Sequence, residues 1–199
     1  MRKLLTSALI FSLLSTPAFA DRYEFDKSHT NIMFRINHLG FSNMIGLFTD
    51  YSGGFTFDPQ KPEASTIDVT IKPSSVRTSS PELDAHLQKE EFFNSAKFPD
   101  IRFVSTGVKV TGSNTGEVTG NVTMLGVTKP ATLKVVFNKM DVHPYTKAYI
   151  AGFSADATIK RSDFGMNYGI PNVGDEVTLH IETEGVNLDR KAEAPKDQK

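Results

Sequence analysis

The chain has 199 residues and a formal net charge of −1, with 15 phenylalanines, no tryptophan and no cysteine. Without cysteine there is no disulfide, no thiol catalysis and no lipid attached to an N-terminal cysteine. The balanced charge also lacks the basic footprint of a nucleic-acid-binding protein. An acidic ligand would therefore need a local cationic patch.

The first 20 residues, MRKLLTSALIFSLLSTPAFA, place Arg2 and Lys3 before an apolar stretch that ends in Ala18-Phe19-Ala20. This pattern predicts a signal peptide over residues 1–20, cleaved after Ala20, and its apolar part is too short for a permanent membrane span. An uncleaved anchor is the less favoured alternative. Loss of the two N-terminal cations changes the formal charge from −1 to −3. We expect a mature protein in the bacterial periplasm, without stable transmembrane anchoring.

Residues 21–190 are dominated by period-two alternation, which is typical of antiparallel strands with one buried face. In TIDVTIKP, for example, Ile67, Val69 and Ile71 alternate with polar residues, and DEVTLHIET repeats the pattern. Short polar connections such as TGSNTGE predict hairpin turns. The segment is long enough for one domain with its own core. The charged tail over 191–199 has no apolar anchors and is predicted to be disordered.

The alternation stops over residues 79–98, which contain SSPELDAHLQKEEFF. Ser80 can cap a helix there, and Pro81 suits its first turn. We expect one short helix, packed on the sheet or across an opening. Phe92 and Phe93 would fix its continuation, FFNSAKFP, to the strands.

Two architectures fit many antiparallel strands and one helix: a sandwich and a closed barrel. Small residues interrupt large ones on two predicted inner faces, which read Tyr149, Ala151, Phe153, Ala155, Ala157, Ile159 and Val118, Gly120, Val122, Met124. Such small residues either admit neighbouring side chains or leave space. A sandwich core must fill completely, whereas an eight-stranded barrel can hold one elongated ligand. The pattern favours the barrel.

Three motifs in order, YEFDKSHTNIMFRINHLGFSNMIGLF, LDAHLQKEEFFNSAKFPDIRF and TGNVTMLGVTKPATL, resemble the YceI-like family of exported proteins. The resemblance runs from Tyr23 to about Val186. It implies an all-β, antiparallel, eight-stranded lipocalin-like barrel with one short helix. It also implies that a polyisoprenoid or other fatty amphiphile binds in an internal tunnel, and that the protein forms a homodimer. One departure is DAHLQ, where the family often has basic residues.

A tunnel for a lipid tail needs an apolar lining, and it needs hydrogen-bond donors only where it opens to solvent. By alternation, the inward phenylalanines are Phe34, Phe55, Phe103, Phe137 and Phe153, and the alternative is that they are ordinary core. His38 and Arg161 are the candidates for contact with a polar head group, because anion recognition needs donors at the mouth. Surface salt bridging is the alternative for these two residues.

His86 is the strongest candidate for catalysis. It lies two residues from Asp84, so on a helix the two side chains point in different directions. His29, His38 and His86 could meet at the mouth of a barrel and form a metal site, although their spacing in the sequence does not require it. The chain has neither G-x-S-x-G nor a glycine-rich phosphate loop. We therefore assign no catalytic residue, metal or cofactor and predict binding without turnover. The alternatives are an enzyme that modifies an isoprenoid lipid and an envelope stress-response or interaction protein with a filled barrel.

Overall fold

The computed structural model describes residues 20–190. The predicted signal peptide, apart from Ala20, and the predicted disordered tail lie outside the described residues. Within residues 20–190, no helix is both long enough and apolar enough to cross a membrane.

In the part of the chain that the structure describes, eleven strand segments pair antiparallel in a single sheet. They are β1 (Asp21–Phe25), β2 (Asn31–His38), β3 (Ser42–Phe48), β4 (Tyr51–Phe57), β5 (Thr66–Ile71), β6 (Val76–Arg77), β7 (Ile101–Val110), β8 (Thr115–Met124), β9 (Val127–Val142), β10 (Tyr149–Lys160) and β11 (Val173–Asn187). The helical elements are α1 (Pro81–Leu87) and three short 3₁₀ turns, η1 (Pro62–Ala64), η2 (Pro73–Ser75) and η3 (Arg161–Phe164).

The segments close into a ring because several of them are halves of one long strand. β1 and β2 both pair with β11, with Phe25 opposite Gly185 and Asn31 opposite Glu182. In the same way β4 pairs with β1 and β3 pairs with β2. On the next strand, β5 pairs with β4 and β6 pairs with β3. Three such interruptions reduce the segments to eight strands, and the pairing of β1 with β11 closes the barrel. The predicted eight-stranded antiparallel barrel with one short helix is confirmed.

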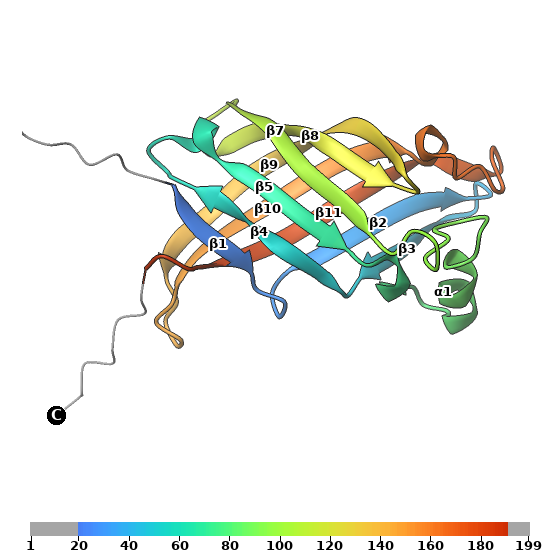
Figure 1. Ribbon diagram of the computed structural model, residues 1–199, viewed down its shortest axis with the longest axis horizontal. Coiled ribbons are helices and arrows are strands. Elements are labelled where there is room, and N and C mark those ends of the chain that lie inside the picture. Colours follow the sequence, from blue (N-terminus) through green and yellow to red (C-terminus); the bar gives the residue numbers. More distant parts are fainter. Residues whose placement is uncertain (1–19, 191–199) are drawn as a thin grey trace, which may run out of the picture.

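The two ends of the barrel differ in what covers them (Figure 1). At one end lie α1, the β2–β3 hairpin and the loop that follows η3. At the other end lie the first and last described residues and the β9–β10 hairpin. Loops carry a disproportionate share of binding residues, so the two ends offer a ligand different surroundings.

The helix α1 begins where the sequence predicts. The Ser80 side chain accepts a hydrogen bond from the backbone N–H of Leu83 at 3.3 Å, and Pro81 occupies the first turn. This cap satisfies one of the orphan donors of the first helical turn. After the helix, the Phe93 ring packs edge-on against Phe48, with ring centroids 5.7 Å apart. The expected anchoring of α1 to the barrel is thus present.

Candidate functional site

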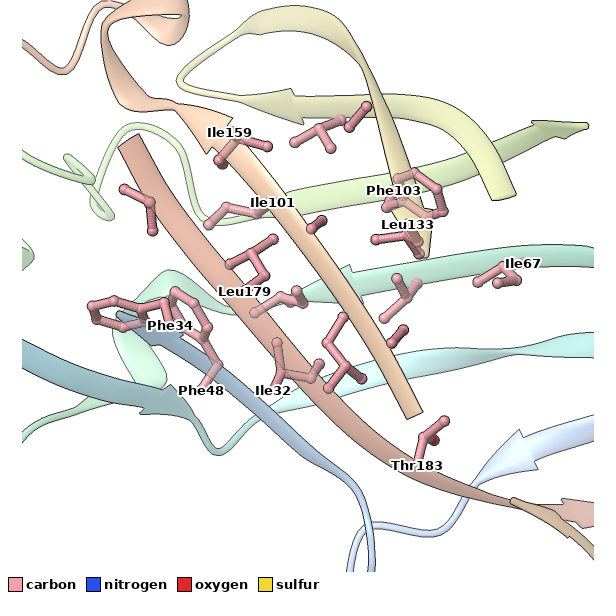
Figure 2. Close-up of a pocket in the computed structure, with 18 of the residues that line it drawn as sticks. Ile32, Phe34, Phe48, Ile67, Ile101, Phe103, Leu133, Ile159, Leu179 and Thr183 are labelled. Atoms are coloured by element: carbon pink, nitrogen blue, oxygen red, sulfur yellow. The ribbon is translucent and has the colours of Figure 1, made fainter. Parts of the chain in front are cut away.

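The interior of the barrel is hollow. A cavity of about 690 Å³ runs along it, and every strand of the ring contributes to its wall. Figure 2 shows aliphatic side chains that converge on this space, including Ile32, Ile67, Ile101, Leu133 and Leu179. The volume falls in the range of about 300–1,000 Å³ that is usual for sites of small molecules.

Small residues on the inner face explain the hollow in two ways. Ala155 and Ala157 lie directly on the cavity, so no side chain from this part of β10 fills it. Gly120 instead receives a neighbour, because the ring of Phe103 occupies the place where its Cβ would stand. The rings of Phe34 and Phe55 lie in the same way over Gly46 and Gly185. Both expectations for small residues on the inner face are therefore realised.

An empty hollow of this size is energetically expensive. Unfilled volume in a closed core costs about 24 cal/mol per Å³, so an empty lumen stabilises the fold less than a filled interior would. Water gains little in such a space, because a buried water needs polar partners. The interior therefore favours an apolar guest.

The five phenylalanines named from the sequence all border the cavity: Phe34, Phe55, Phe103, Phe137 and Phe153. Phe55 and Phe153 pack edge-on with centroids 5.3 Å apart, within an aromatic cluster that also contains Tyr23, Phe57 and Phe137. The inward orientation that alternation indicates is present. Contact of these rings with a ligand stays a prediction.

Arg161 borders the cavity, but its guanidinium is largely engaged by the protein. Only 2% of the residue is exposed. Its Nε donates to the carbonyl of Gly174 at 2.8 Å, and its terminal nitrogens donate to the carbonyls of Met166, Tyr168 and Val173 at 3.2, 2.8 and 3.1 Å. Burial lowers the pKa of Arg161, and nearby Asp175 opposes this shift.

Four of the five guanidinium N–H groups are thus used to hold the backbone. The surface salt bridge that the sequence left open does not describe this residue. Arg161 shapes the loop after η3, and its contact with a head group stays a prediction.

His38 is the last residue of β2, and it is exposed at the mouth of the cavity. It stands opposite Val173 in the pairing of β2 with β11. The next backbone N–H, that of Leu39, donates to the carbonyl of Asn172 at 2.9 Å. This strand end and the loop after η3 therefore form one edge of the mouth.

The other edge of the mouth is formed by α1 and the residues that follow it, the segment for which the sequence predicts a helix. His86 Nε2 lies 2.9 Å from a carboxylate oxygen of Glu91. The His86 ring packs edge-on against Phe92 and Tyr168, with centroids 4.9 and 5.7 Å away. His86, Phe92 and Tyr168 all border the cavity. Helix α1 therefore lies across the opening, which is one of the two positions that the sequence analysis expects for it.

The candidate catalytic groups do not converge. The Asp84 carboxylate accepts from the backbone N–H and hydroxyl of Thr78 at 2.6 and 2.7 Å, away from His86. His29 lies outside the cavity lining, and its Nδ1 is 2.8 Å from Asp26, whose hydrogen bond raises the pKa of His29. Among residues 20–190, the grouping with metal-ligand geometry is Asp26, His29 and Glu184. It includes neither His38 nor His86, so the three-histidine site is not assembled.

Sequence reasoning missed much of the mouth. Tyr168, Met44 and Thr78 border the cavity there, although none was a candidate. Met44 lies on the inner face of a strand that the alternation could have identified. Tyr168 reaches the cavity only through the conformation of its loop, and no local pattern indicates that.

The chain matches the family model described as the YceI-like domain over residues 23–185. Protein YceI of Salmonella heidelberg is 42% identical over 190 residues, which cover 94% of this chain and 98% of the relative. The crystal structure of the Campylobacter jejuni YCEI protein superposes with a TM-score of 0.67 at 29% identity, covering 92% of this chain and 98% of that one.

A polyisoprenoid binding domain from Saccharophagus degradans has the same fold, with a TM-score of 0.64 at 13% identity. The alignment covers 84% of this chain and 99% of that domain. At this identity the likeness concerns the fold alone. The family model and the Salmonella relative each span most of the chain. The chain therefore belongs to the YceI-like family.

Proposed function

We propose that the protein binds a long-chain isoprenoid or other fatty amphiphile in its barrel and carries or sequesters it without chemical change. The observation that carries this proposal is the apolar cavity of about 690 Å³, walled by all strands of the ring. The name of the Saccharophagus domain, a polyisoprenoid binding domain of the same fold, supports the choice of ligand class.

The energetics favour a long tail over a small polar ligand. Burial of each CH₂ group contributes about 0.8 kcal/mol, so a tail of about twelve carbons contributes about 10 kcal/mol before the costs of association. Micromolar affinity requires about 8 kcal/mol. The wall offers no charged partner along its middle, where Ile32, Ile67 and Leu133 face the cavity. Binding therefore depends chiefly on the length of the tail.

We infer that the polar end of such a ligand lies at the mouth beside α1. His38, Thr78, His86 and Tyr168 border the cavity there and supply donors and acceptors. The aromatic cluster around Phe55 and Phe153 borders the cavity further from α1. A tail directed toward this cluster leaves the head group near water.

The export pattern of residues 1–20 supports the bacterial periplasm as the compartment. In that compartment a carrier would shield a water-insoluble lipid between membranes. The homodimer implied by family resemblance stays part of the proposal.

Native mass spectrometry tests the binding directly. Protein purified from cells should retain a lipid, and delipidated protein should take up geranylgeraniol from a dilute ethanol dispersion. The matched control is Ala155→Phe, which places a ring in the lumen at a residue that borders the cavity. Absence of both retained lipid and uptake by the native chain would refute the proposal. Equal uptake by Ala155→Phe would place the ligand outside the barrel.

The enzymatic alternative predicts turnover that depends on a histidine at the mouth. His86→Ala should then abolish product formation from an isoprenoid substrate while leaving binding intact. Recovery of the bound lipid unchanged from both the native chain and His86→Ala supports binding without catalysis. A product that appears only with the native chain would establish an enzyme.

A further inference from the structure

Two segments around the mouth lack acidic residues, lysine and arginine, and His38 is the titratable histidine between them. Residues 36–49 and 165–174 contain no Asp, Glu, Lys or Arg. Across the whole chain 23% of residues are charged, a share that would place several charges in segments of this combined length. We call these two segments the uncharged rim. The first includes the β2–β3 hairpin, and the second is the loop after η3.

The uncharged rim is one connected structure. His38 is opposite Val173 in the sheet, and the N–H of Leu39 donates to the carbonyl of Asn172 at 2.9 Å. Arg161 binds four carbonyls of the second segment and its boundary from inside. The rim therefore presents its side chains from a fixed backbone.

The largest side chains that the rim exposes are apolar or aromatic, and they stand among uncharged polar ones such as Asn43 and Asn172. Phe41 is 90% exposed, Leu39 47% and Tyr168 53%. Leu39 and Gly40 adopt positive φ angles of 55° and 76°, which form the tight turn that carries Phe41 outward. His38, Tyr168 and Val173 of the same rim border the cavity. The exposed apolar tip thus stands beside the opening of the tunnel, while α1 and its continuation at the same end (Figure 1) carry exposed charges that include Glu82, Lys89 and Glu90.

The hairpin at the opposite end of the barrel does not share the character of the β2–β3 tip. Its most exposed aromatic residue is Tyr145, 87% exposed on the β9–β10 hairpin. Charged groups flank it, including Lys147 and the ion pair between Lys139 and Asp141 at 2.9 Å. Charges resist insertion into a bilayer, whereas aromatic and apolar side chains favour its interface.

We propose that the uncharged rim docks on the surface of a lipid bilayer and sets the mouth of the tunnel against the source of its ligand. This inference rests on the proposed function. Shallow insertion of Phe41 and Leu39 would let an apolar tail pass from membrane to tunnel without crossing water. A stable contact with another protein usually buries about 800 Å² on each partner. A protruding hairpin tip with few large side chains suits a reversible bilayer contact better.

Vesicle binding and lipid transfer test the docking. The variant Leu39→Asn with Phe41→Ser keeps a residue that tolerates positive φ at the turn, and Tyr145→Ser is the matched control at the other end. With phosphatidylcholine vesicles that contain geranylgeraniol, we expect the double variant to lose about tenfold or more in vesicle affinity and transfer rate. Tyr145→Ser should match the native chain. Because the rim is uncharged, salt should change the native affinity little.

Uptake from an ethanol dispersion, without vesicles, separates this inference from the proposed function. The double variant should fill as completely there as the native chain. If the native chain takes up lipid from the dispersion but the double variant binds vesicles and accepts lipid from them equally well, docking by the rim is refuted and the proposed function survives. If the native chain takes up no lipid, the proposed function fails. If the double variant only converts a dimer to a monomer by light scattering, the rim is a contact between two copies, and bilayer docking is refuted.

Discussion

A single enlargement of an alanine on β10 distinguishes a hollow barrel from a filled one by the sign of its effect. Ala157 borders the cavity, and its Cα partner on β11 is Leu179. Ala157→Leu adds three carbon atoms that can project into the empty space. At about 0.8 kcal/mol for each buried carbon, delipidated protein should gain about 2 kcal/mol of unfolding free energy. For a domain of this size that corresponds to a rise in Tm of about 4–8 °C.

The matched control lies on the same strand. Ala151 is fully buried, outside the cavity lining, among Tyr23, Phe55 and Phe57. Ala151→Leu should therefore overpack a filled region and lower the unfolding free energy by about 1–3 kcal/mol. The two variants make the same chemical change with opposite expected signs.

Thermal unfolding of delipidated protein, followed by circular dichroism, measures both effects. Titration with geranylgeraniol then adds a second reading, because the ligand should raise the Tm of the native chain more than that of Ala157→Leu. If Ala157→Leu lowers Tm as much as Ala151→Leu does, the interior at this position is already full. The hollow, and the argument for a lipid ligand built on it, would then be wrong.

Two further predictions concern polar groups. Arg161→Lys should lower the unfolding free energy by about 3 kcal/mol or more, because a lysine cannot reach four diverging carbonyls. Hydrogen exchange at the Leu39 amide, which donates to the same loop, should accelerate. An unchanged Tm would contradict the role given to Arg161. The hydrogen bond that His180 Nδ1 donates to the Asp156 carboxylate, with support from Glu182, raises the pKa of His180. A raised pKa stabilises the fold fully below the unfolded value of about 6.5, and this contribution is lost as pH rises through the folded value. Asp156→Asn should therefore lower Tm more at about pH 5.5 than at about pH 8.5, and NMR titration should show a lower His180 midpoint; an equal Tm loss at both pH values would contradict the argument.

Alternation predicts the inner wall well because it depends only on the pleat of each strand. Ile67, Val69 and Ile71 border the cavity as the sequence indicates. The Ser80 cap and the anchoring of α1 follow in the same way from short-range chemistry. These features need no knowledge of which strands become neighbours.

The features that the sequence could not provide depend on distant backbone. Arg161 looks like an exposed loop cation from its neighbours in the chain. It is buried because carbonyls of residues 166–174 turn toward it, after a loop in which Gly165 adopts a φ of 86°. Tyr168 reaches the mouth through the same loop. No local pattern encodes the direction of a loop carbonyl, so the mouth was predicted less completely than the wall.

The hollow itself follows from where large rings find room. A chain with 15 phenylalanines could collapse into a filled core. Here the rings of Phe34, Phe55 and Phe103 are received by glycines, so part of their bulk lies within the wall. Ala155 and Ala157 then leave the axis open. The contrast between Gly120, which accepts a ring, and Ala157, which faces empty space, shows that residue size alone does not predict a cavity. The cross-strand neighbour decides whether a small residue is filled or left free, and that neighbour is known only once the register of the barrel is known.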